Sequence, residues 1–103
     1  MTYMDLVNSF RANPREIPTA PINGSAPKWF YVYENQGSVF VSSGRDHVNA
    51  CHVNPDRRLN RAEFSDMLNI YLRRKAGAAV SQEAKARSIN QSYWFGVFKA
   101  VEA

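Results

Sequence analysis

The sequence predicts an α+β fold in two layers, in which a small antiparallel sheet of three or four strands packs against two or three helices. Three patterns support this class: an amphipathic helical stripe near the start, an aromatic and β-branched hairpin, and a capped helix past the middle. The 103 residues, 45% of them hydrophobic, suffice to bury one core without a disulfide or a metal. We therefore expect a single domain over residues 1–103, with an N-terminal helix and proline-rich connector in 1–27 and the sheet and helical hairpin core in 28–103.

The first predicted helix covers residues 2–11, with Thr2 as its N-cap. Asn13-Pro14 ends it, and the connector that follows contains further prolines and an Asn-Gly pair up to Pro27. Because proline lacks a backbone N–H, we expect this connector to form neither helix nor strand. The apolar residues of the helix recur at i, i+3, i+4 and i+7, namely Tyr3, Leu6, Val7 and Phe10.

The connector leads into a predicted β-hairpin, with strands at 29–34 and 38–42. Asn35-Gln36-Gly37 supplies the turn, and Gly37 suits a position with positive φ. Residues 45–53 fit either a third short strand or an irregular loop.

The best-specified element is a helix over residues 61–76, with Asn60 as N-cap, Glu63 completing a capping box, and Gly77 as the residue that ends it. A second, shorter helix begins after Ser81 and ends near Ile89-Asn90. The last segment, 92–101, alternates two sets of largely apolar residues and therefore predicts a central strand that completes the sheet.

Positive charge is concentrated between residues 57 and 87. This segment holds eight of the thirteen Lys and Arg residues but three of the nine acids, so its net charge is +5 and that of the remainder is −1. Nine of the thirteen are arginines, whose planar guanidinium binds phosphate oxygens in pairs and stacks on bases. We therefore expect a non-enzymatic protein that binds nucleic acid or another polyanion through a basic face. The predicted contacts are Arg57, Arg58, Arg61, Arg73, Arg74, Lys75, Lys85 and Arg87.

Other interpretations remain open at this stage. The same cations suit a solvated surface and the dipole of a helix C-terminus. The two helices around Gly77 have the outline of a helix-turn-helix, in which Gln82, Glu83, Lys85 and Arg87 would face bases. Tyr31, Tyr33, Tyr93 and Phe95 suit either the core or an exposed stacking platform for bases, with Lys28 and Lys99 nearby. The Asn90-Gln91-Ser92 junction offers amides for adenine edges or for turn backbone.

Four potential ligands lie within seven positions: Asp46, His47, Cys51 and His52. The spacing matches no common zinc pattern, and adjacent residues of a strand would point to opposite faces. We therefore expect no metal and no cofactor, and a thiol enzyme or metal-dependent nuclease is the weakest of the functional classes. A protein-binding adaptor or inhibitor is the alternative to polyanion binding.

Two features of the sequence bear on the cellular compartment: it has a single cysteine, Cys51, and it shows no signal-peptide pattern. Together they predict a reducing, cytoplasmic setting. No apolar run approaches the roughly 20 residues needed to cross a bilayer, so we expect no membrane partner.

Overall fold

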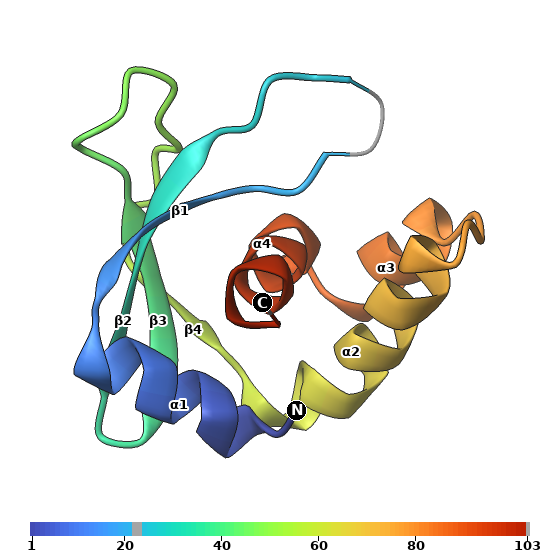
Figure 1. Ribbon diagram of the computed structural model, residues 1–103, viewed down its shortest axis with the longest axis horizontal. Coiled ribbons are helices and arrows are strands. Elements are labelled where there is room, and N and C mark those ends of the chain that lie inside the picture. Colours follow the sequence, from blue (N-terminus) through green and yellow to red (C-terminus); the bar gives the residue numbers. More distant parts are fainter. Residues whose placement is uncertain (22–23, 103) are drawn as a thin grey trace.

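A computed structural model describes residues 1–21 and 24–102, and it confirms the α+β class (Figure 1). The four strands form one antiparallel sheet in the order β1-β2-β3-β4. The sheet is one layer, and the helices lie on one side of it. In chain order the elements are α1 (Tyr3–Ala12), β1 (Arg15–Pro18), β2 (Trp29–Asn35), β3 (Ser38–Ser43), β4 (Arg57–Leu59), α2 (Arg61–Lys75), α3 (Ser81–Arg87) and α4 (Gln91–Val101).

Most local capping and turn signals are confirmed, but Glu63 does not complete the predicted capping box, because its carboxylate accepts from the Ser88 hydroxyl and the Trp94 indole N–H. Thr2 and Asp5 form a reciprocal capping box at the start of α1. Asn60 caps α2 by accepting from the Ala62 N–H at 3.0 Å, and Gly77 follows the helix end with φ of 97°. The hairpin turn is tighter than predicted, because two residues, Gln36 (φ 51°) and Gly37 (φ 80°), join β2 to β3.

The prediction of a strand over 92–101 is wrong, since this segment is helix α4. Its residues are apolar at almost every position, so a helical stripe at Trp94, Val97, Phe98 and Val101 is present beside the alternation. A helix lets Gly96 sit directly against the sheet: an added Cβ would lie 2.8 Å from the Pro18 carbonyl oxygen and 2.9 Å from the Phe30 ring. The apolar pattern of this segment fits both a helix and a strand, and packing against the sheet favours the helix.

Two further strands differ from prediction. The connector contains β1, which pairs with β2 at the edge of the sheet, where Pro14 just before the strand and Pro18 as its last residue are tolerated. The other edge strand is β4, formed by residues for which no strand was predicted. Residues 45–53 form an irregular loop. In the described part of the chain, this loop joins the sheet through a single isolated β-bridge between Ala50 and Trp29.

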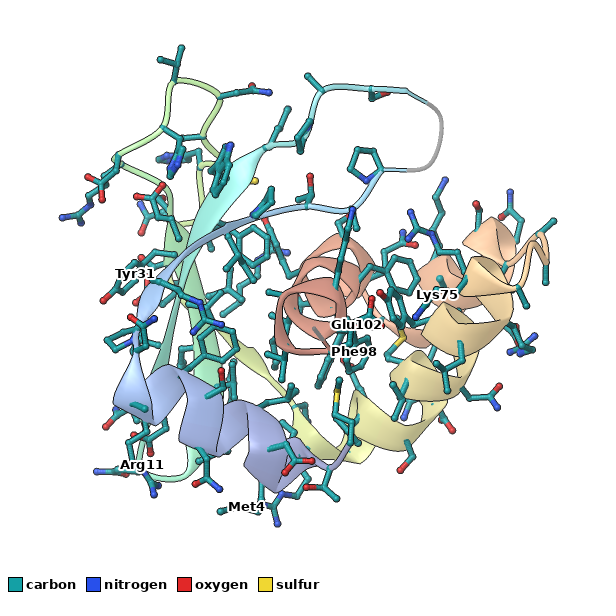
Figure 2. The ribbon with its side chains drawn as sticks, in the orientation of Figure 1. Met4, Arg11, Tyr31, Lys75, Phe98 and Glu102 are labelled. Atoms are coloured by element: carbon teal, nitrogen blue, oxygen red, sulfur yellow. The ribbon has the colours of Figure 1, made fainter. Side chains whose placement is uncertain are left out.

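The two faces of the sheet have different environments. Its inner face contributes buried residues from all four strands, including Ile17, Phe30, Val41 and Leu59, to a core shared with the helices. The outer face bears half-buried aromatic side chains, and none of the described helices covers it. Figure 2 shows Tyr31 on this outer side and Phe98 between α4 and α2.

Candidate functional site

A groove of about 930 Å³ runs between the connector before β2, the loop 50–52, and the start of α4, and we call it the basic groove. These segments are arranged around α4 in Figure 1. Four Lys and Arg side chains line it, and none of its described lining residues is Asp or Glu. The charged and aromatic lining consists of Lys28, His52, Arg57, Arg74, Lys85, Tyr93 and Phe95.

Two of these arginines are held in place by neutral partners. The Arg57 guanidinium donates to Oδ1 of Asn90 at 3.2 Å and lies 5.8 Å from the Tyr93 ring centre. Arg74 donates to the Ala20 carbonyl and lies 4.7 Å from the centre of the Phe95 ring. Neither partner carries a charge, so these hydrogen bonds hold the guanidinium groups at the groove wall without pairing them with a carboxylate. Burial lowers the pKa of Arg74 below its ordinary value.

The two lysines of the groove are not held by such contacts with any residue that the structure describes. Lys28 and Lys85 are exposed, and among the described residues neither makes an ion pair. The sequence prediction missed Lys28 and His52 as members of this site. Both lie outside the basic segment in sequence, and only the tertiary fold brings them to the groove. Gln91 and Ser92 also line the groove, at the N-terminal end of α4, where the backbone amides favour anions.

Three of the predicted contact residues lie outside the basic groove and are neutralised by carboxylates. The partners are far apart in sequence, by 10 to 27 residues, so charge counting along the chain did not find them. Because each pair cancels locally, these cations add little to a basic surface. The ion pairs are Arg73–Glu83 at 2.6 Å, Lys75–Glu102 at 2.9 Å and Arg87–Asp66 at 2.6 Å.

The remaining two predicted contacts also lie elsewhere. Arg61 packs over the Tyr3 ring at 5.0 Å. Arg58 pairs with Phe40 across β3 and β4, which places it on the outer face of the sheet. The structure therefore brings Arg57, Arg74 and Lys85 of the predicted set together.

The short helix α3 is turned towards α2 rather than outwards. Glu83 receives two hydrogen bonds from Arg73, and Arg87 donates to Asp66 and to the Ala62 carbonyl. Two of the four residues that a helix-turn-helix would present to bases are thus engaged in packing the helical hairpin.

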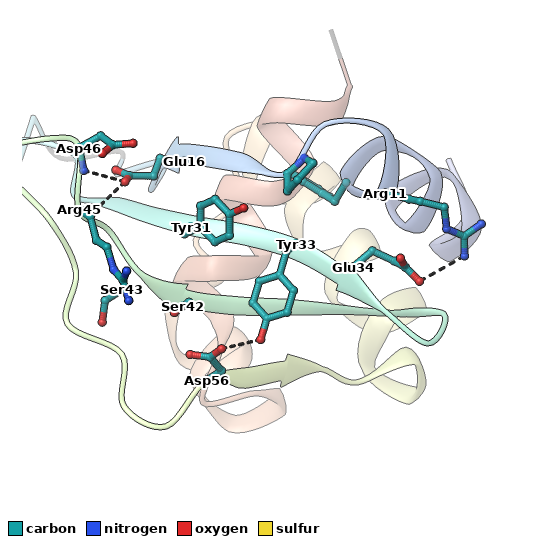
Figure 3. A pocket seen from close by; sticks show the side chains of 12 residues that line it. Arg11, Glu16, Tyr31, Tyr33, Glu34, Ser42, Ser43, Arg45, Asp46 and Asp56 are labelled. Carbon is teal, nitrogen blue, oxygen red and sulfur yellow. Dashed lines mark hydrogen bonds and ion pairs between the residues drawn. The ribbon is translucent and has the colours of Figure 1, made fainter.

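A second concave region, which we call the outer pocket, lies on the uncovered face of the sheet (Figure 3). Its volume is about 570 Å³. The Tyr31 and Tyr33 rings form its floor, and Tyr33 also stacks on Phe40 with ring centres 5.5 Å apart. Tyr93 and Phe95, the other two rings of the expected stacking platform, lie on α4 in the basic groove. The structure therefore divides these four rings between two surfaces.

Carboxylates border the outer pocket, and hydrogen bonds order three of them. Glu16 accepts from His47 Nδ1 at 2.9 Å and from two backbone N–H groups, which lowers the pKa of its carboxyl. A hydrogen bond from Arg11 likewise lowers the pKa of Glu34. The hydrogen bond from the Tyr33 hydroxyl lowers the pKa of Asp56 and raises the pKa of Tyr33 to about 12.

The cluster of potential ligands at 46–52 is dispersed. His47 stacks on Trp29 with ring centres 3.6 Å apart, Cys51 packs against the core, and His52 lines the basic groove. Burial raises the pKa of the Cys51 thiol, which disfavours the reactive thiolate. Within residues 1–21 and 24–102, no three His, Cys, Asp or Glu side chains come close enough to hold a metal ion.

Comparisons with protein-family profiles, with curated proteins and with solved structures found no match for this chain. Of the helices that the structure describes, none has the length and apolar character required to span a membrane.

Proposed function

We propose that this protein binds nucleic acid, or a polyanion of similar charge density, in the basic groove. The observation that carries the proposal is the composition of that groove: four Lys and Arg side chains without a carboxylate among its described lining residues. Arg57 and Arg74 are held in place by neutral groups, so their positive charges are not paired with carboxylates in these contacts. Phosphate oxygens of a ligand could then pair with these guanidinium groups.

The groove offers more than charge. Tyr93 lines the groove beside the Arg57 guanidinium, and an unpaired base can stack on an accessible aromatic ring. A strand with exposed bases fits this arrangement better than a duplex, whose bases are stacked inside. The proposed compartment is the cytoplasm, in keeping with the single free thiol.

The test is binding of a short labelled single-stranded oligonucleotide across a salt series. Four phosphate contacts predict a slope of log K against log salt of about −3, or about 50-fold weaker binding when salt rises from about 50 to about 200 mM. The variant Lys28→Gln/Lys85→Gln removes two contacts and should show about a sevenfold loss over the same range.

The matched control is Arg58→Gln/Lys99→Gln, which removes the same charge from exposed residues outside the groove. It should keep the slope of the unaltered protein. Equal losses in both variants would show that net charge and not the groove governs binding, and salt-independent binding would exclude a polyanion ligand. Duplex DNA and heparin as competitors separate a preference for unpaired strands from general attraction to polyanions.

A further inference from the structure

The outer pocket is a surface that no other described segment of the chain covers. The inner face of the same sheet is covered by α1 and α4, whereas the rings of Tyr31, Tyr33 and Phe40 remain half-exposed. Aromatic side chains that stay accessible on an ordered sheet are typical of binding surfaces. The charged residues that line the pocket indicate which kind of ligand would bind there.

The charge of the outer pocket selects cations. Four carboxylates and two guanidinium groups line it, which leaves a net charge of −2. Figure 3 shows these carboxylates at both ends, Glu16 and Asp46 at one and Glu34 at the other, with the rings of Tyr31 and Tyr33 between them. An occupant with two positive charges therefore complements the pocket.

Among the described residues, an acceptor oxygen without a hydrogen-bond partner remains at each end, at Asp46 and at Glu34, whose side chain is 13% exposed. The contacts of Glu34 with Arg11 and with the Gly37 N–H both use Oε2, so Oε1 has no partner among the described residues. The Asp46 carboxylate likewise has no hydrogen bond or ion pair within the described part of the chain. The lowered pKa values of Glu16, Glu34 and Asp56 keep these carboxylates ionised at neutral and mildly acidic pH.

We propose that the outer pocket docks an extended basic segment of a partner protein, with one arginine over the Tyr31 and Tyr33 rings beside Asp46 and a second arginine at Glu34. Arginine suits the pocket better than lysine, because its planar guanidinium both stacks on rings and pairs with carboxylates. The chain itself uses this contact inside the fold, where Arg15 lies 4.6 Å from the Phe10 ring centre.

The geometry also sets the spacing of the two arginines. Tyr31 and Glu34 are three residues apart on β2, which corresponds to about 10 Å in a strand. Because the side chains of an extended segment alternate between two faces, two arginines that both point into the pocket have one or three residues between them, about 7 or about 13 Å apart, and only the longer spacing spans this distance. This site is separate from the basic groove, so its test does not depend on polyanion binding.

The experiment titrates the full chain with synthetic peptides in which two arginines are separated by one, two or three glycines. Calorimetry gives the affinity, and amide chemical shifts locate the site. We expect the three-glycine spacing to bind best, with shifts at Tyr31 and Tyr33, and replacement of arginine by uncharged citrulline to abolish binding. Asp46→Asn should weaken binding about threefold, and Asp46→Asn/Tyr31→Leu about tenfold.

The matched control is Asp66→Asn, which removes the same charge from α2, outside the outer pocket, and should leave peptide affinity unchanged. Equal weakening by both aspartate variants would overturn the proposal, as would undiminished binding of the citrulline peptide. Spermine binding at the same residues as tightly as the best peptide would assign the pocket to a small polycation instead. Self-association that Asp46→Asn abolishes would assign it to a second copy of this chain.

Discussion

The basic groove and the outer pocket lie on different sides of the sheet and acquire opposite charge by different means. The groove gathers cations from separated segments, residues 28, 57, 74 and 85, and keeps them away from acids. In the outer pocket, hydrogen bonds from neighbouring residues hold ionised carboxylates around a tyrosine floor. Charge at a surface is therefore determined by which charged residues the fold gathers there rather than by the charge count along the chain.

The two surfaces also depend differently on the helical layer. Groove residues Tyr93 and Phe95 belong to α4, and Asn90 at its start holds Arg57. The outer pocket is built mainly from β1, β2, β3 and the loop after β3. Loosening α4 from the sheet should therefore disturb the groove more than the pocket.

The largest expected effect comes from Gly96→Val. Its side chain would collide with the Pro18 backbone carbonyl and with the fully buried Phe30 ring, so the backbone or the core would have to shift. We expect the free energy of unfolding to fall by about 2 to 3 kcal/mol, measured by urea denaturation followed by tryptophan fluorescence. Hydrogen exchange should accelerate first in α4 and the groove.

The control is Ala62→Val, which adds apolar atoms to an exposed position of α2 and should change stability by less than about 1 kcal/mol. Unchanged stability of Gly96→Val would mean that α4 does not pack against the sheet at this contact.

Sequence reasoning succeeded where a signal was local. The cap at Asn60, the stop at Gly77 and the hairpin around Gly37 depend on a few adjacent residues, and each is present. It failed for α4, whose nearly continuous apolar sequence satisfies both periods, so that contact with Phe30 decides the outcome. The prediction that β1 could not form overlooked that edge strands tolerate proline.

The candidate site shows the same division between local and long-range information. The sequence identified a basic segment, and three of its residues, Arg57, Arg74 and Lys85, line the groove. No local pattern indicates that Lys28 joins them, or that Lys75 is paired with Glu102 across 27 positions. Such pairings depend on the tertiary fold, which charge patterning does not encode.

Acid pH should separate the two surfaces. A carboxyl whose pKa is lowered by folding stabilises the protein above its ordinary pKa, and this contribution is lost as pH falls through the lowered value. For Glu16 and Glu34 the ordinary value is 4.5, so stability should decline below about pH 4.5 and the outer pocket should lose its negative charge. The basic groove has no carboxylate among its described lining residues and should keep its charge.

We therefore expect peptide docking to weaken between about pH 5 and pH 3 while oligonucleotide binding persists as long as the chain is folded. Thermal unfolding across the same range should show a shallower pH dependence for Glu16→Gln than for the unaltered chain. Parallel pH profiles for both ligands would contradict the assignment of carboxylates to one surface alone.

The smallest expected effect concerns the cations that the sequence placed in the binding face and the structure pairs with acids. In Arg73→Gln/Arg87→Gln, two positive charges are lost from the basic segment, but neither residue lines the groove. Oligonucleotide affinity at moderate salt should therefore change by no more than about twofold, because both charges are already compensated locally by Glu83 and Asp66. The loss of two exposed ion pairs should lower the free energy of unfolding by about 1 kcal/mol or less each. A loss of affinity equal to that of Lys28→Gln/Lys85→Gln in the same anisotropy titration would show that the whole basic segment, and not the groove, governs binding.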